Sequence, residues 1–497
     1  MSIFSTKSLD TLLAQASDHE KGLKRTLTPL TLIALGIGAI IGAGLFVRTA
    51  AAAAQNAGPS VTLAFLVAAL GCAFAGLCYA ELSSSIPIAG SAYTYSYATM
   101  GELVAWIIGW DLVLEYAVGA ATVGIAWSEY LNNLLEHVLH LSPVPFQWCH
   151  SPFEQQIVNN VATGVHGIIN LPALFIITAL TLLLIRGTQE SAVVNALIVV
   201  TKVSIVVLII ALGWGFVNPS NHVPYIPEAS IFKDSQGIEH SYGGIMGILG
   251  GAGVVFFAFI GFDAVSTAAQ EAKNPKRDMP IGILGSLGIC TVLYVLFAHV
   301  LTGIAPVADF RGPGKEASVA YAINTYMKGY EWLGTSVTVA ILAGFSSVIL
   351  VMLLGQSRVF YSMSVDGLLP KIFSDVHPTY KTPHKANLVI LVIVGLFAAF
   401  VPGDIVGDMT SIGTLFAFIL VCLAVVVLRR TAPDLPREFK TPLVPYVPML
   451  GVGVCAAMIF GLGWTNWLRL FVWLALGLVI YFGYSRKHSV LQRSLER

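Results

Sequence analysis

The chain has 497 residues, of which 56% are hydrophobic and only 11% are charged. A soluble globular domain carries roughly 25% charged residues, so the composition excludes an ordinary water-soluble protein and indicates a surface that faces lipid. Acidic and basic residues balance at 27 each, so the net charge predicts no nucleic-acid partner.

Twelve segments are long and apolar enough to be membrane-spanning helices. The chain then divides into a polar tail at 1–28, one transmembrane domain at 29–485 and a second tail at 486–497. Because one segment is short and the last two nearly touch, eleven spans remain an alternative. In chain order the segments lie near 29–51, 60–86, 101–131, 168–186, 191–217, 243–268, 280–304, 333–359, 386–402, 409–428, 446–464 and 467–485.

The basic residues are distributed unevenly between the two sides of the membrane. With twelve spans, the side that carries both termini holds 20 of the 27 lysines and arginines. Such an excess marks the cytoplasmic side. The sequence therefore predicts a multi-pass cell-membrane protein with both termini in the cytoplasm. The long loops at 132–167, 218–242 and 305–332 then face outward.

The first span is rich in glycine, with four glycines among the nine residues from Gly36 to Gly44. Glycine weakens a helix because it lacks a Cβ and loses more conformational freedom on folding. Close helix packing through the pair Gly38 and Gly42 is the alternative reading. The density of glycines favours a broken helix.

The sixth span has the same character, because glycines interrupt its apolar run at 250, 251 and 253 and an acid follows at Asp263. Paired, glycine-interrupted spans in two halves of a chain are typical of a transporter's binding site. The N–H end of a broken helix suits a carboxylate and the C=O end suits an ammonium. One free amino acid carries both groups, so the pattern favours amino-acid transport.

Three ionisable residues lie deep within spans. Lys202, in the fifth span, is predicted to be functional, because charge inside a membrane usually is, although a static pair with an acid is the alternative. Glu115, in the third span, could equally stabilise packing through hydrogen bonds. Asp263 follows the break of the sixth span, and capping of the next half-helix is its favoured role.

The sequence shows few features of an enzyme, a channel or a metal site. The six cysteines form no CxxC pair, and the outer-loop histidines at 137, 140, 150 and 166 lack further ligands at useful spacing. We therefore expect neither a metal nor a cofactor. No nucleophile and base converge at membrane depth, and no spans carry the polar stripes of a channel.

Four motifs in this order resemble the amino acid–polyamine–organocation superfamily, closest to its cationic amino acid transporter branch and the related bacterial permeases. The motifs are GIGAIIGAGLF at 36–46, FFAFIGFD at 256–263, EAKNPKRDMPIGI at 271–283 and GQSRVFYSMSVDGLLPKIF at 355–373. The resemblance implies an all-α membrane protein with the LeuT-type fold. This fold is an inverted repeat of five plus five helices, here with two more, giving about twelve transmembrane helices.

The resemblance also implies a substrate site built from backbone atoms. In the first span these atoms would belong to Ile40, Gly42, Ala43 and Gly44, and they would meet the carboxylate and the amine. In the sixth span the carbonyls of Phe257, Ala258 and Ile260 would meet the amine, and Phe257 would also act as a gate. Many relatives carry a hydroxyl residue where this chain has Ala43, so one contact to the carboxylate would be missing.

Ion coupling is a further implication of the resemblance. Lys202 matches a lysine that in related permeases occupies the place of a sodium ion and takes part in proton coupling. Ser346 and Ser347 match sodium-binding positions of sodium-coupled relatives, but with Lys202 present we expect no dependence on sodium.

The predicted function is proton-coupled amino-acid uptake by alternating access. Its partners are the amino acid, the proton and the lipid bilayer, and the sequence leaves protein partners unknown. An exchanger or facilitative carrier of cationic amino acids or polyamines, and a nutrient sensor on the same fold, are the alternatives. The apolar face at 342–351 of the eighth span carries no acid and favours neutral substrates, whereas the branch name favours cationic ones.

Overall fold

The computed structural model describes residues 4–8, 27–42, 44–86, 91–158, 161–186, 192–233, 239–267, 269, 272–311, 318–380 and 382–496. Within these residues, eight helical runs are long and apolar enough to cross a membrane, and four shorter apolar helices accompany them. Together they cover all twelve predicted segments. The run Gly44–Ser85 contains the end of the first segment and nearly all of the second, and the shorter helix Pro29–Ile40 contains the start of the first.

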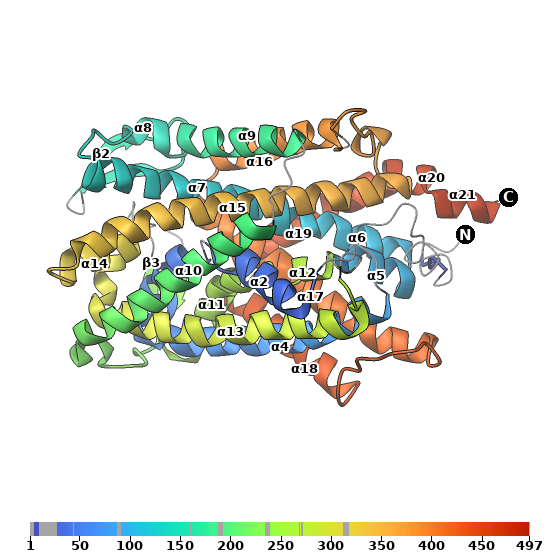
Figure 1. Ribbon diagram of the computed structural model, residues 1–497, viewed down its shortest axis with the longest axis horizontal. Coiled ribbons are helices and arrows are strands. Elements are labelled where there is room, and N and C mark those ends of the chain that lie inside the picture. The colour runs from blue at the N-terminus through green and yellow to red at the C-terminus, as the bar shows by residue number, and fades with distance from the viewer. Residues whose placement is uncertain are drawn as a thin grey trace.

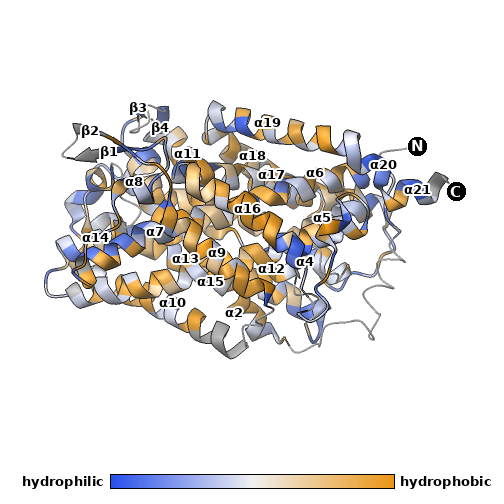
Figure 2. Cartoon of the chain, turned by 90° about the horizontal axis from the view of Figure 1, so that it is seen from above, coloured by the Kyte–Doolittle hydropathy of each residue, from blue (hydrophilic) through white to orange (hydrophobic). Residues whose placement is uncertain are grey.

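The helices lie side by side along the long axis of the molecule (Figure 1). Hydrophobic residues fill its middle and hydrophilic residues gather at its two ends, as a membrane requires (Figure 2). The main helices are α2 (Pro29–Ile40), α4 (Val61–Ser85), α6 (Glu102–Val113), α7 (Gly119–Asn133), α9 (Leu171–Ile185), α10 (Ala192–Gly213), α11 (Gly244–Val255), α13 (Pro275–Ile304), α15 (Glu331–Val365), α16 (His384–Phe400), α17 (Gly403–Thr431), α18 (Tyr446–Gly461) and α19 (Trp464–Ile480).

Shorter elements join and extend these helices. They are α3 (Thr49–Ala52), α5 (Ser91–Thr99), α8 (Phe146–Cys149), α12 (Ala264–Thr267), α14 (Ser318–Tyr326), α20 (Arg486–His488) and α21 (Val490–Glu496). Two π-helical segments matter for the site: η1 (Gly44–Arg48) continues the first span, and η4 (Leu114–Val118) joins α6 to α7.

The described chain is mostly helical, as predicted, but two of the long loops also contain short strands. Strands β1 (Gln155–Val158) and β2 (Val161–His166) form one antiparallel hairpin, and β3 (Ser230–Lys233) and β4 (Glu239–Tyr242) form another. Both lie outside the twelve apolar segments, where water can satisfy the open strand edges. Hydropathy locates spans well, but it carries no information on the structure of the polar loops between them.

The spans pack in two groups. The first comprises α2, α4, α11 and α13, in which α13 packs on α2 and α4, and α4 packs on α11. The second comprises α7, α9, α15 and α16. Helix α10 lies between the groups and contacts α2 and α13 on one side and α15 on the other. The surroundings of residues on α10 therefore depend on how the two groups are arranged.

Both terminal segments reach the same end of the molecule. The Lys7 ammonium pairs with the Asp366 carboxylate at 3.1 Å, at the end of α15. The backbone N–H of Val490, which begins α21, donates to the Asp366 carbonyl at 3.0 Å. The two tails thus share one side of the membrane domain.

A partly buried histidine attaches the loop between α7 and α9 to the third span. His150 Nε2 lies 3.0 Å from a Glu129 carboxylate oxygen on α7, and His150 Nδ1 lies 3.2 Å from the Cys149 sulfur. Burial disfavours the charged imidazolium, but the hydrogen bonds to Cys149 and Glu129 outweigh it and raise the pKa of His150 to about 12.

This pKa makes the contribution of His150 to stability depend on pH. Because the folded-state pKa lies above the ordinary value of 6.5, the contribution is complete below that value and is lost as the pH rises toward 12. His150→Gln should therefore lower the melting temperature more at about pH 6 than at about pH 9. Melting curves of the purified protein at both pH values test this, with exposed His140→Gln as the control. Equal losses at the two pH values would contradict it.

Candidate functional site

The first and sixth spans are both interrupted at membrane depth. Helix α2 ends at Ile40, and regular structure resumes at Gly44 as a π-helical turn. Helix α11 ends at Val255, passes into the 3₁₀ turn η8 (Phe256–Phe259) and resumes as a helix only at Ala264. The predicted breaks are present in both spans, so each exposes backbone polar groups inside the protein.

The two breaks lie against each other. A Cβ added to Gly44 would overlap the Cα of Ala258, and a Cβ added to Gly261 would lie 2.9 Å from the Ala39 carbonyl oxygen. Gly261 also adopts φ = +109°, a conformation that other residues rarely take. Glycine is therefore needed here for close backbone approach, and the breaks form one continuous set of backbone groups.

The predicted substrate residues that the structure describes all lie at this contact and are buried. They are Ile40, Gly42 and Gly44 of the first span, and Phe257, Ala258 and Ile260 of the sixth. Ala43 lies outside the described residues. These positions lie in or next to the two breaks, and their role in substrate binding stays a prediction.

Tyr294 on α13 joins the two breaks, and the sequence analysis missed it. Its hydroxyl lies 3.0 Å from the Ile40 carbonyl oxygen and 2.9 Å from the Ala258 carbonyl oxygen. One hydroxyl proton can serve only one of these carbonyls at a time. Nothing in the sequence near Tyr294 marks it, because its importance arises from where α13 packs against the breaks.

Replacing Tyr294 by phenylalanine should weaken substrate binding. The change leaves two buried carbonyls without their donor, and an unsatisfied buried polar group costs about 1–3 kcal/mol. We expect roughly tenfold weaker binding, since about 1.4 kcal/mol corresponds to tenfold in affinity. Isothermal titration of Tyr294→Phe measures the loss, and exposed Tyr361→Phe on α15 serves as the control. Equal affinities in the two variants would contradict this role.

Lys202 on α10 reaches the first break from the side. Its ammonium donates to the Gly38 carbonyl at 3.0 Å, and its side chain packs on Gly344 of α15, where a Cβ would lie 2.9 Å from the lysine Cε. Only 3% of Lys202 is exposed. The lysine therefore links α2 of the first packed group to α15 of the second.

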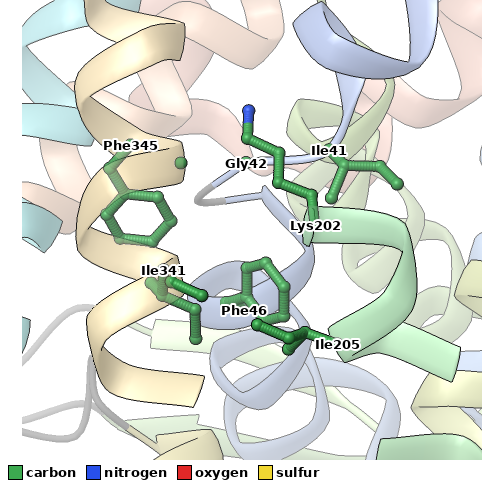
Figure 3. A pocket seen from close by; sticks show the side chains of 9 residues that line it. Ile41, Gly42, Phe46, Lys202, Ile205, Ile341 and Phe345 are labelled. Atoms are coloured by element: carbon green, nitrogen blue, oxygen red, sulfur yellow. The ribbon is translucent and has the colours of Figure 1, made fainter. Parts of the chain in front are cut away.

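A small pocket lies beside this lysine (Figure 3). Its lining is apolar except for Lys202, whose amine is at one end, while Phe46 and Ile205 are at the other. The described lining residues are Ile41, Gly42, Phe46, Lys202, Ile205, Ala340, Ile341, Gly344 and Phe345. Such a chamber suits an apolar group next to a single polar contact.

Comparison with known proteins identifies the family of the chain. The sequence profile of the amino acid permease family matches residues 27–493. The chain belongs to this family. The permease is thus a transporter and not an enzyme.

Three relatives show how widely the family similarity extends. The branched-chain amino acid permease BcaP of Bacillus subtilis (strain 168) is 44% identical over 492 residues, covering 99% of each chain. The methylthioribose transporter of the same organism is 39% identical over 493 residues, covering 99% of this chain and 100% of its own. The vacuolar cationic amino acid transporter 4 of Arabidopsis thaliana is 33% identical over 442 residues, covering 87% of this chain and 68% of its own.

The two serines expected near a sodium position differ in their bonding in the permease. The Ser346 hydroxyl donates to the Leu342 carbonyl of its own helix at 2.9 Å. The Ser347 hydroxyl is buried and has no hydrogen-bond partner among the described residues. Both lie within one turn of Gly344, on which the Lys202 side chain packs.

Asp263 follows the sixth-span break and contacts the third span next to Glu115. The Tyr116 hydroxyl donates to Asp263 at 2.7 Å, and Glu115 precedes Tyr116 in the chain. Asp263 thus bonds to side chains of the third span. The sequence analysis treated the two acids separately, since residues so distant in the chain give no signal of contact.

An ion-pair network joins the first span to α17. Arg48 donates to Asp404 at 3.0 Å and to Asp408 at 2.5 Å, and its side chain is only 4% exposed. Asn466 on α19 donates to Asp408 at 3.2 Å. The network therefore ties η1, the second half of the first span, to α17 and α19.

Proposed function

We propose that this permease is a secondary active transporter that binds amino acids through their α-amino and α-carboxylate groups at the paired breaks. The observation that carries the proposal is the contact of Gly44 with Ala258, which brings N–H and C=O groups of both breaks into one buried site. The substrate residues would be Ile40, Gly42, Ala43, Gly44, Phe257, Ala258 and Ile260.

An apolar substrate side chain fits the surroundings best. Span-eight residues Ile341 and Phe345 and first-span Phe46 make the neighbouring wall apolar. A relative named as a branched-chain amino acid permease is 44% identical, whereas one named as a cationic amino acid transporter is 33% identical. We therefore favour neutral, apolar amino acids over cationic ones.

The transport cycle would couple amino-acid movement to protons through Lys202. The lysine links the two packed groups, so its surroundings must change when the groups move relative to each other. A group whose proton affinity differs between two conformations can couple a proton gradient to alternating access. The proposal also includes a LeuT-type inverted repeat, a single transmembrane domain at 29–485 and termini that lie in the cytoplasm.

Competition for binding tests this assignment. Leucine, valine and isoleucine should compete well, while the amine that lacks the carboxylate and the N-acetylated amino acid should both compete poorly. Methylthioribose is a necessary competitor, because a relative named for it is 39% identical and the compound has neither charged group. Strong competition by methylthioribose or by a decarboxylated amine would overturn amino-acid recognition at the breaks.

A further inference from the structure

A basic pocket lies at the loop between α17 and α18, at the same end of the molecule as both chain termini (Figure 1). Its volume is about 520 Å³, within the range of roughly 300–1,000 Å³ that small-molecule sites occupy. Three cationic side chains, those of Arg429, Arg437 and Lys440, line it together with one acid, Asp434. None of these residues lines the chamber beside Lys202, so the basic pocket is a separate site.

The pocket is built around a buried acid at the end of α4. The fully buried Glu81 carboxylate accepts two hydrogen bonds from Arg429, from Nε at 2.7 Å and from Nη2 at 2.9 Å. Arg437 Nε lies 3.2 Å from the same carboxylate, and the backbone N–H of Thr441 donates to it at 2.7 Å. These contacts fix the loop to α4, so the pocket is formed before any ligand enters, which lowers the cost of binding.

Arg437 uses its other donors to close the end of α17. Its Nη2 donates to the Leu428 and Ala432 carbonyls at 3.2 and 2.7 Å, where the helix leaves carbonyls without helical partners. Its Nη1 donates to the Pro433 and Leu435 carbonyls at 3.1 and 3.0 Å. Arg437 therefore shapes the pocket wall, and its four Nη hydrogens are already in use.

Donors for a ligand remain on the two other cations. Nη1 of Arg429 forms no hydrogen bond with a described residue. Lys440 is exposed and forms no ion pair with an acid among the residues that the structure describes. The three cations face two carboxylates, those of Glu81 and Asp434, so one positive charge is left over. This balance fits a phosphodiester, which carries one negative charge and accepts hydrogen bonds from both arginine and lysine.

The side of the pocket next to α18 is apolar and faces lipid. Val444 lines the pocket, and its neighbours Leu443, Tyr446 and Leu450 are 74%, 71% and 55% exposed. Apolar side chains exposed at the start of a membrane helix contact lipid, and tyrosine is favoured where lipid meets water. The pocket therefore lies at the depth of the lipid headgroups, beside a surface that acyl chains cover.

We propose that this pocket binds the headgroup of an anionic phospholipid. The phosphodiester contacts Arg429 Nη1 and the Lys440 ammonium, while the acyl chains lie along the start of α18. Basic pockets beside membrane helices suit such headgroups because the charge is neutralised without moving the chains out of the bilayer. The inference goes beyond the proposed transport function and needs neither the assigned substrate nor proton coupling.

Native mass spectrometry of the permease in detergent, titrated with dioctanoyl phosphatidylglycerol, tests the proposal. Lys440→Gln should weaken binding of this lipid about fivefold, because one basic residue contributes roughly that factor to the attraction of anionic lipid. Asp434→Asn should strengthen binding, since it removes a negative charge from the pocket wall. Dioctanoyl phosphatidylcholine, whose headgroup has no net charge, should bind more weakly to the wild type.

A matched control lies one residue from the pocket. Arg430 at the end of α17 is exposed and does not line the pocket, so Arg430→Gln removes the same charge from the same end of the molecule. This variant should bind phosphatidylglycerol as the wild type does. Melting curves establish that each variant is folded, which we expect because the side chains of Lys440, Asp434 and Arg430 are all exposed.

Several outcomes would overturn the proposal. Equal affinities of Lys440→Gln and Arg430→Gln would show that the lipid responds only to overall charge. Equal binding of phosphatidylcholine and phosphatidylglycerol would leave only apolar contacts. Displacement of the lipid by inorganic phosphate at the same concentration would assign the pocket to a free anion. If Lys440→Gln does not fold, unchanged or weaker binding by Asp434→Asn decides against the proposal in its place.

Discussion

Lys202→Met should lose proton-driven accumulation of amino acid while the protein remains folded. An inward gradient of about one pH unit supplies about 1.4 kcal/mol per proton, enough for about tenfold accumulation by the wild type. The variant lacks the ammonium that contacts Gly38 and packs on Gly344, so its accumulation should fall to the equilibrium ratio of about one. Uptake into proteoliposomes with an imposed pH gradient, with and without sodium, measures this.

The control removes a lysine that has no place in the site. Lys233 on the β3–β4 hairpin pairs with Glu239, and both side chains are more than half exposed. Lys233→Met should accumulate amino acid as the wild type does. Unchanged accumulation by Lys202→Met would remove Lys202 from coupling, and sodium-driven uptake by the wild type would refute proton coupling as a whole.

Gly44→Val should lose substrate binding. The added Cβ overlaps the backbone of Ala258, which cannot turn aside as a flexible side chain can. Overpacking typically costs about 1–3 kcal/mol and occasionally more. Because the added Cβ would overlap backbone atoms of Ala258, we expect a cost at the upper end of this range. Substrate affinity should fall by about a hundredfold or more, as measured by isothermal titration, because roughly 1.4 kcal/mol corresponds to tenfold.

A second glycine variant separates loss of the site from loss of folding. Gly288 on α13 is exposed, and a Cβ there would meet nothing within 4 Å. Gly288→Val should bind substrate with wild-type affinity. If Gly44→Val is monodisperse, melts like Gly288→Val and still binds normally, the substrate site lies elsewhere than at the two breaks.

Some features of the permease follow from local sequence alone. Apolar runs located the eight helical runs that are long enough to span a membrane and the four shorter apolar helices of the described chain, because the bilayer selects for length and hydropathy whatever the neighbouring helices are. The clustered glycines located both breaks for an equally local reason, since a chain without Cβ atoms resists continuous helix. The depth of Lys202 marked it as exceptional because a charge in lipid is costly wherever it lies.

Only the tertiary structure decided which of these features meet. The contact of Gly44 with Ala258 joins positions more than 200 residues apart, and Tyr294 reaches both breaks from a third span. The hydrogen bond from Tyr116 to Asp263 likewise depends on how the third and sixth spans are placed. Hydropathy and propensity describe a residue and its near neighbours, whereas close approach between distant segments is set by packing, to which every span contributes.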